Sequence, residues 1–310
     1  MGEKHMLDEK QGILLESGTN ELEIMEFKIG ENTFGINVAK VREIMTQEEV
    51  TRIPHSHPTV EGIYKPRDVV ITVVNLPAYL EFEQSEDSTR DLFIITNFNK
   101  LNIAFRVHSV VGINRISWQD IQKPDKAIYG GNDGVATGIA EYDGRLITIV
   151  DFEKIIADIS PETTIQVNEI DSLGERGQYE EPILIAEDSV LLSKMIHESL
   201  HKAGYKNLIK CDNGQEAFDY LTNLKGDPDL YKKVACIITD IEMPRMDGHH
   251  LTKLVKDDKE LKKIPVIIFS SLINREMRIK GEQLGADAQL SKPEIGHLVK
   301  MVDKHILKIR

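Results

Sequence analysis

One stretch in the C-terminal half of the chain decides the fold of that half: Val234-Ala-Cys-Ile-Ile-Thr-Asp-Ile-Glu-Met-Pro-Arg-Met-Asp-Gly248. Residues 234–239 form a short apolar run, which is typical of a strand buried in a parallel sheet. Asp240 follows directly where that strand ends. In open α/β sheets the reactive crevice lies beyond the carboxyl ends of the strands, so we expect Asp240 to lie in it.

Short apolar runs and helical stretches alternate on both sides of this segment. Further strands are predicted at 183–186, 208–211, 266–269 and 286–290. Apolar residues spaced three and four positions apart predict helices at 192–203, 215–224, 251–255, 275–284 and 295–309. Five strand–helix units with right-handed crossovers predict a doubly wound (βα)5 domain over residues 182–310.

Polar side chains follow the ends of four of these strands. They are Glu187, Asp188, Asp240, Ser270 and Lys292. Three carboxylates and a single lysine at one rim carry an excess of negative charge, which predicts a bound divalent cation. Oxygen ligands without histidine or cysteine favour Mg²⁺ or Mn²⁺ over zinc. A carboxylate beside a metal and a lysine can accept a phosphoryl group, because that transfer depends mainly on positioning and charge neutralisation.

Taken together, these motifs closely resemble the receiver domains of two-component signalling, over residues 182–310. The resemblance implies that Asp240 is the phosphorylation site and that Lys292 and Ser270 contact the phosphoryl oxygens. Gln289 stands where many receivers carry an aromatic residue that swings inward on activation. The implied metal ligands are Glu187, Asp188, Asp240 and the backbone carbonyl of Glu242.

Other side chains of this half receive a structural interpretation. Cys211 and Cys236 are expected to be inert thiols of the core. The remaining candidates lack metal-ligand spacing and are expected to be solvated helix residues: His197, His201, His249 and His250.

The N-terminal half has a period of two instead. Apolar and polar residues alternate at 25–29 and 101–107, which predicts strands with one buried face. A single short helix is predicted from Ala39 to Met45. This pattern indicates an all-β region of small antiparallel barrels.

Four segments of this half resemble CheW, the chemotaxis coupling protein. They are 35–44, 50–54, 62–67 and 73–76. The resemblance implies paired five-stranded SH3-like barrels that bridge chemoreceptor cytoplasmic tips to the histidine kinase CheA. Val41, Glu43 and Arg67 match positions tied to receptor contact. The alternatives are that Val41 belongs to the core and that Arg67 forms a local salt bridge.

The predicted organisation has four parts. They are an N-terminal extension (1–19), a CheW-like domain (20–159), an acidic linker (160–181) and the receiver (182–310). The linker holds six acidic residues and a single arginine with Pro161, Gly174 and Gly177, which predicts a flexible tether spanning about 25 Å. A CheW-like module followed by a receiver is the arrangement of CheV-type coupling proteins.

Composition excludes several classes of protein. The chain has 310 residues, of which 41% are hydrophobic and 29% charged, as in globular proteins. Residues 1–181 hold 17 basic and 32 acidic residues, a formal charge of −15, whereas residues 182–310 hold 21 and 19. The acidic half is a poor partner for nucleic acid. No apolar run is long enough to cross a bilayer, so we expect a cytoplasmic protein without direct membrane insertion. The resemblance to CheW implies that it is recruited to membrane-associated receptor arrays.

The sequence therefore predicts a chemotaxis adaptor that couples receptors to CheA, is regulated by phosphorylation of Asp240, and is not an enzyme. One alternative is a transcriptional response regulator, but the receiver reaches Arg310 with no DNA-binding unit after it. Another is a phosphatase with Asp240 as nucleophile. Such hydrolases usually carry a second aspartate two residues later, where this chain has Glu242.

Overall fold

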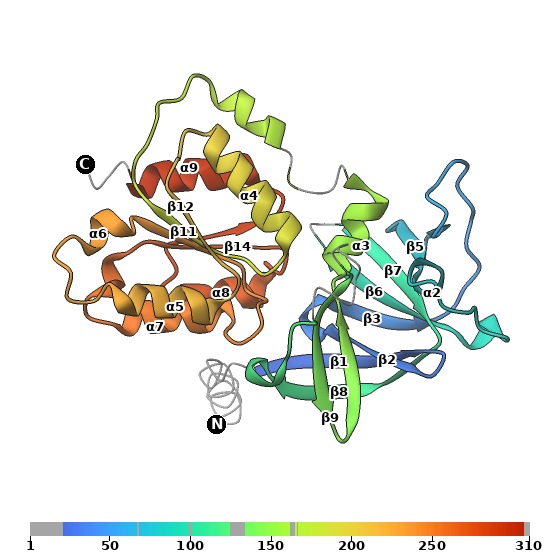
Figure 1. The fold of residues 1–310 in the computed structure, drawn as a ribbon. Helices are drawn as coiled ribbons and strands as arrows, with labels where there is room; N and C mark the ends of the chain where they lie inside the picture. The colour runs from blue at the N-terminus through green and yellow to red at the C-terminus, as the bar shows by residue number, and fades with distance from the viewer. Residues whose placement is uncertain are drawn as a thin grey trace, which may run out of the picture. The chain divides into compact units, whose positions relative to one another are not determined.

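The computed structural model describes residues 21–66, 68–98, 101–124, 134–161, 165 and 167–306. The predicted N-terminal extension and Arg67 lie outside the described residues. The chain folds as two compact units, one formed by Leu22–Ile116 with Asp120–Thr164 and the other mainly by Ile165–Arg310 (Figure 1). Each unit is described by itself below.

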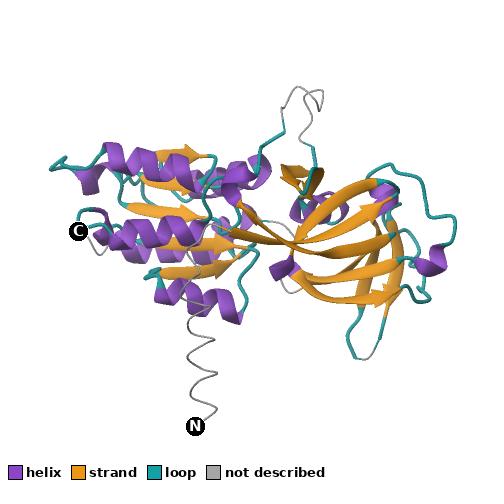
Figure 2. Cartoon of the chain, turned by 90° about the horizontal axis from the view of Figure 1, so that it is seen from below, coloured by secondary structure: helices purple, strands orange, loops and turns teal. Residues whose placement is uncertain are grey.

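Two five-stranded sheets build the N-terminal unit, as the sequence predicts. One sheet has the order β8 (Ser109–Ser117), β1 (Glu21–Ile29), β2 (Asn32–Asn37), β10 (Arg145–Val150) and β9 (Ala136–Tyr142). The other has the order β3 (Val41–Thr46), β6 (Leu92–Phe98), β7 (Leu101–Val107), β5 (Ile71–Asn75) and β4 (Val60–Tyr64). Figure 2 shows these strands in orange.

The prediction of purely antiparallel sheets is wrong in one respect. Each sheet contains a parallel pair, β2 with β10 and β5 with β7. The paired strands belong to hairpins that are distant in sequence, so no tight turn determines their relative direction.

The predicted helix from Ala39 to Met45 is also wrong. A 3₁₀ turn covers only Val38–Lys40, and β3 then runs from Val41 to Thr46. This strand pairs antiparallel with β6 over most of its length. The β-branched side chains of Val41 and Ile44 favour this extended pairing over a helix.

Apolar side chains from both sheets meet in one core. Phe27, Phe105 and Phe152 are fully buried there, and the rings of Phe105 and Phe152 pack edge to face with centroids 4.7 Å apart. Phe152 begins helix α3 (Phe152–Ile159), whose first turn is capped by Asp151 accepting from the Lys154 amide at 2.9 Å. A shorter helix, α2 (Leu76–Tyr79), follows β5 in the same way and is capped by Asn75.

A parallel five-stranded sheet forms the centre of the C-terminal unit, as predicted. Its order is β12 (Leu208–Cys211), β11 (Ile183–Ala186), β13 (Cys236–Thr239), β14 (Val266–Ser270) and β15 (Ala288–Ser291). Two helices cover one face, α4 (Val190–Lys202) and α9 (Ile295–Ile306) (Figure 1). The other face carries α5 (Gly214–Asn223), α6 (Leu230–Lys233), α7 (Gly248–Asp257) and α8 (Arg275–Gln283). The sequence did not predict the one-turn helix α6.

Both cysteines lie in this unit and are buried. Burial raises the pKa of the Cys236 thiol to about 12 and that of Cys211 to about 11. The interpretation of both residues as core thiols is confirmed.

Much of the segment interpreted as a flexible tether is packed against the C-terminal unit. Ile165 and Ile170 are buried in its core, and the 3₁₀ helix Val167–Leu173 lies against α4 and α9. Tyr179 stacks on Tyr205 with ring centroids 4.8 Å apart. The composition of residues 160–181 does not predict these contacts, because only a few apolar residues among many acidic and polar ones make them.

Candidate functional site: a carboxylate cluster around Lys292

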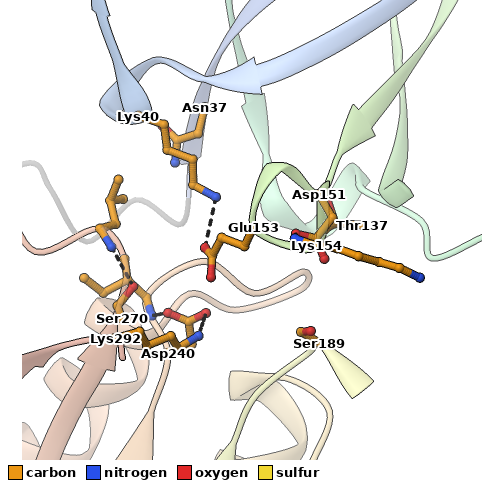
Figure 3. A network of polar contacts seen from close by, with 12 residues as sticks. Asn37, Lys40, Thr137, Asp151, Glu153, Lys154, Ser189, Asp240, Ser270 and Lys292 are labelled. Carbon is orange, nitrogen blue, oxygen red and sulfur yellow. Dashed lines mark hydrogen bonds and ion pairs between the residues drawn. The ribbon is translucent and has the colours of Figure 1, made fainter. Parts of the chain in front are cut away.

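Asp240 lies where β13 ends, and its carboxylate is held from two sides. Its Oδ1 accepts a hydrogen bond from the Ile241 amide at 2.6 Å, and its Oδ2 lies 3.0 Å from Nζ of Lys292. The residue is 5% exposed, so it is largely removed from water. Figure 3 shows the ion pair of Lys292 and Asp240 near Ser270.

Glu187 follows β11, the neighbouring strand, and contacts the same lysine. Its Oε2 lies 2.8 Å from Nζ of Lys292, and its Oε1 accepts from the Ser189 amide at 3.2 Å. Burial raises the pKa of Glu187 well above its usual range, and the charge of Lys292 opposes that shift. One ammonium therefore serves two buried carboxylates.

Three carboxylates of this rim are close enough to share a cation. Oxygens of Glu187, Asp188 and Asp240 all lie within 4.8 Å of one another. Oxygen-only donors of this kind fit Mg²⁺ or Mn²⁺, and an ion there would offset the charge that Lys292 leaves uncompensated. The carbonyl of Glu242 stays a predicted fourth ligand.

Ser270 is the last residue of β14 and lies at the same rim of the sheet. It pairs with Ser291 across the sheet, and its carbonyl accepts from the Lys292 amide at 3.1 Å. Its hydroxyl oxygen accepts from the Leu272 amide at 3.2 Å. The Ser270 hydroxyl therefore lies at the same rim as Lys292 and Asp240. This agrees with the expectation that polar side chains at the carboxyl ends of parallel strands meet at one edge of the sheet.

Comparison with known proteins decides the family. Residues 23–160 match the model of the CheW-like domain, and residues 183–303 match that of the response regulator receiver domain. Chemotaxis protein CheV3 of Helicobacter pylori is 30% identical over 287 residues, covering 88% of this chain and 91% of the relative. The chain belongs to the CheV family.

Two further relatives agree with this assignment. Chemotaxis protein CheV2 of Helicobacter pylori is 30% identical and covers 87% of this chain and 89% of its own. Chemotaxis protein CheW of Thermotoga maritima is 27% identical, covering 47% of this chain and 95% of its own. As a member of the CheV family, the chain is a chemotaxis coupling adaptor with a phosphorylatable receiver.

Two of the predicted receptor-contact residues of this CheV-family chain, Val41 and Glu43, lie in the first half of β3. Val41 is half-buried and packs against the core shared by the two sheets, whereas Glu43 is exposed. Arg67 lies outside the described residues.

Gln289, at the position where the resemblance to receivers predicts a switch aromatic, lies in β15. Its Nε2 donates to the carbonyl of Arg278 on α8 at 2.7 Å. Its Oε1 would lie 2.3 Å from a Cβ placed on Gly281, so the amide fills the space where that helix has no side chain. In this CheV-family receiver the amide therefore ties β15 to α8.

The predicted solvent exposure of His249 is wrong. This residue was expected to be solvated, yet it is 2% exposed at the start of α7, a helix that packs against both α5 and α8. Burial, followed by the charge of Lys280, lowers the pKa of His249 to about 3. Helical spacing alone cannot show that neighbouring helices cover this residue.

Proposed function

We propose that Asp240 accepts a phosphoryl group from the histidine kinase CheA, and that this modification regulates how the CheW-like domain couples chemoreceptors to the kinase. The convergence of Glu187, Asp240 and Lys292 at one rim carries the proposal. That arrangement combines a nucleophilic oxygen with a fixed cation, which phosphoryl transfer requires.

The transfer step follows from these positions. A carboxylate oxygen of Asp240 attacks phosphorus, a P–O bond forms, and the P–N bond to the donor histidine breaks. The imidazole nitrogen keeps the electron pair of that bond. Lys292 would pair with the phosphoryl oxygens, and the Ser270 hydroxyl would donate a hydrogen bond to one of them.

Glu187, Asp188 and Asp240 would hold Mg²⁺ or Mn²⁺, with the Glu242 carbonyl as a further ligand. When bound, the ion supplies positive charge that lowers the repulsion between the incoming phosphoryl group and the carboxylates. The three carboxylates support this assignment by their mutual distances.

Coupling is assigned to residues 20–159. We infer that the exposed Glu43, with Val41 and Arg67, contributes to receptor contact and recruits the chain to receptor arrays. Among the described residues, no helix has the length and apolar character to cross a bilayer. Phosphatases that use an aspartate nucleophile usually carry a second aspartate two residues later, and this chain has Glu242 there. We therefore propose that Asp240 stays phosphorylated as a signal and that the chain does not turn over phosphate esters as an enzyme.

Transfer from phosphorylated CheA tests this proposal. The full chain, incubated with phospho-CheA and Mg²⁺, should gain one acid-labile phosphoryl group, and Asp240→Asn should abolish the gain. Asp219→Asn, an exposed aspartate of α5, is the matched control and should label as wild type does. Equal labelling of Asp240→Asn would refute the site, and rapid turnover of small phosphate esters would favour a phosphatase.

A further inference from the structure

The segment 167–179, here called the strap, is attached to the receiver by apolar contacts. Ile170 is 3% exposed, and the 3₁₀ helix of the strap lies in contact with α4 and α9. Leu173 and Tyr179 also pack against this core. In Figure 1 the yellow-green chain of this region runs beside these two helices.

Arg176 connects the strap to the C-terminal half of α9. Its guanidinium makes two hydrogen bonds to Asp303, at 2.6 and 3.1 Å, and a third to the Ala203 carbonyl at 2.7 Å. Tyr205 donates to the same carboxylate at 2.6 Å. A bidentate, largely buried arginine–carboxylate pair holds its partners in one geometry better than exposed ion pairs do.

Glu169 connects the strap to the other end of α9. Its Oε2 accepts from the Gly296 amide at 3.3 Å, in the first turn of that helix. A carboxylate there is favoured by the free amides and the positive end of the helix dipole. The strap therefore holds α9 near both ends.

The first turn of α9 is also the part of that helix nearest in sequence to the carboxylate cluster. Helix α9 begins at Ile295, three residues after Lys292. Phosphorylation adds a charge of about −1.5 to −2 and three acceptor oxygens beside this lysine. Lys292 must then divide its interactions between the phosphoryl group and its present partners, Glu187 and Asp240.

We propose that the strap is the output element of the receiver. A change at Lys292 alters the start of α9, and the strap transmits this change to the coupling domain, which precedes the strap in the chain. This relay rests on phosphorylation of Asp240 as proposed above. It uses the contacts at Glu169 and Arg176, neither of which touches the phosphorylation site.

Hydrogen exchange on the full chain tests the relay. The chain is treated with Mg²⁺ alone or with Mg²⁺ and acetyl phosphate, and Asp240 modification is followed by intact mass. We expect exchange in peptides covering 167–179 to rise about tenfold in the phosphorylated protein, because the contacts at α9 weaken. Asp240→Asn should show no such rise.

Two strap variants separate the relay from simple packing. Glu169→Gln should reduce the phosphorylation-dependent change in strap exchange while Asp240 is still modified. Arg176→Gln should raise strap exchange before phosphorylation. Glu175→Gln, an exposed acid of the same segment, is the matched control and should behave as wild type.

The outcomes are distinguishable. Modified Asp240 with unchanged strap exchange would overturn the relay and leave the proposed function intact. Absence of modification would overturn both. A Glu169→Gln protein with the full wild-type response would overturn the role of the contact at the start of α9.

Discussion

Nζ of Lys292 lies 3.0 Å from Oδ2 of Asp240, although the residues are 52 positions apart in the chain. The same ammonium lies 2.8 Å from Glu187. Lys292→Ala would leave two buried carboxylates without this cation, and we expect the unfolding free energy of the receiver to fall by about 3–5 kcal/mol. Denaturant unfolding of the full chain without divalent ions measures the loss, and added Mg²⁺ should recover part of it.

Lys232→Ala is the control for this change. Lys232 also pairs with an aspartate, Asp229 at 2.8 Å, but its side chain is 82% exposed. Such pairs contribute below about 1 kcal/mol. Equal losses in the two variants would mean that the buried carboxylates do not depend on Lys292.

His249 should make the receiver less stable in mild acid. Its pKa is about 3 in the folded chain, mainly because it is buried, against about 6.5 when unfolded. Below pH 6.5 the unfolded chain binds a proton that the folded chain does not, so stability falls as pH falls. Between pH 7.5 and 5.5 the expected loss from this residue is about 1.4 kcal/mol.

The matched variants are His249→Phe and His297→Phe. The first should remove this part of the pH dependence, as seen in denaturant midpoints at the two pH values. The second changes a ring that is 59% exposed and should leave the pH dependence unchanged. A His249→Phe protein with the wild-type difference would assign the acid sensitivity to other groups.

The receiver fold and its site were predictable because parallel strands are buried on both faces and read as plain apolar runs. The strands at 183–186 and 208–211 have the predicted bounds. Asp240, Glu187 and Lys292 are far apart in the sequence. Their proximity could still be predicted, because the carboxyl ends of parallel strands meet at one edge of the sheet.

Burial that depends on partners elsewhere in the chain was not predictable. Ile170 lies among acidic residues, and its burial depends on α4 and α9, which are formed by later parts of the sequence. His249 is buried in α7, a helix that packs against α5 and α8. The parallel pairs of the two N-terminal sheets likewise join strands of separate hairpins.

Ile170→Ala should destabilise the receiver, because the side chain is 3% exposed in its core. Truncation of a buried isoleucine costs about 2–5 kcal/mol. Thermal unfolding of the full chain measures this, and Leu146→Ala, at a residue 66% exposed, is the control with an expected loss within about 0.5 kcal/mol. Equal stability of Ile170→Ala and wild type would restore the interpretation of a free tether.

Neither cysteine should react in the native protein. The thiolate is the nucleophile, and burial raises the pKa of Cys236 to about 12 and of Cys211 to about 11. Alkylation at pH 8 should be at least about 100-fold slower than in the denatured chain, as expected for groups that react only after opening. Peptide mass spectrometry assigns the rates, and fast native labelling of either residue would contradict its place in the core.

Gly248→Ala should damage the site through the backbone. A Cβ at this position would lie 1.8 Å from the carbonyl oxygen of Asp240, and a backbone atom cannot rotate away as a side chain can. We therefore expect a loss of about 3 kcal/mol or more in stability and slower phosphorylation of the molecules that fold. Gly112→Ala, where a Cβ meets nothing within 4 Å, is the control. If the folded fraction of Gly248→Ala accepted phosphoryl groups at the wild-type rate, the close approach would serve packing of α7 and not the position of Asp240.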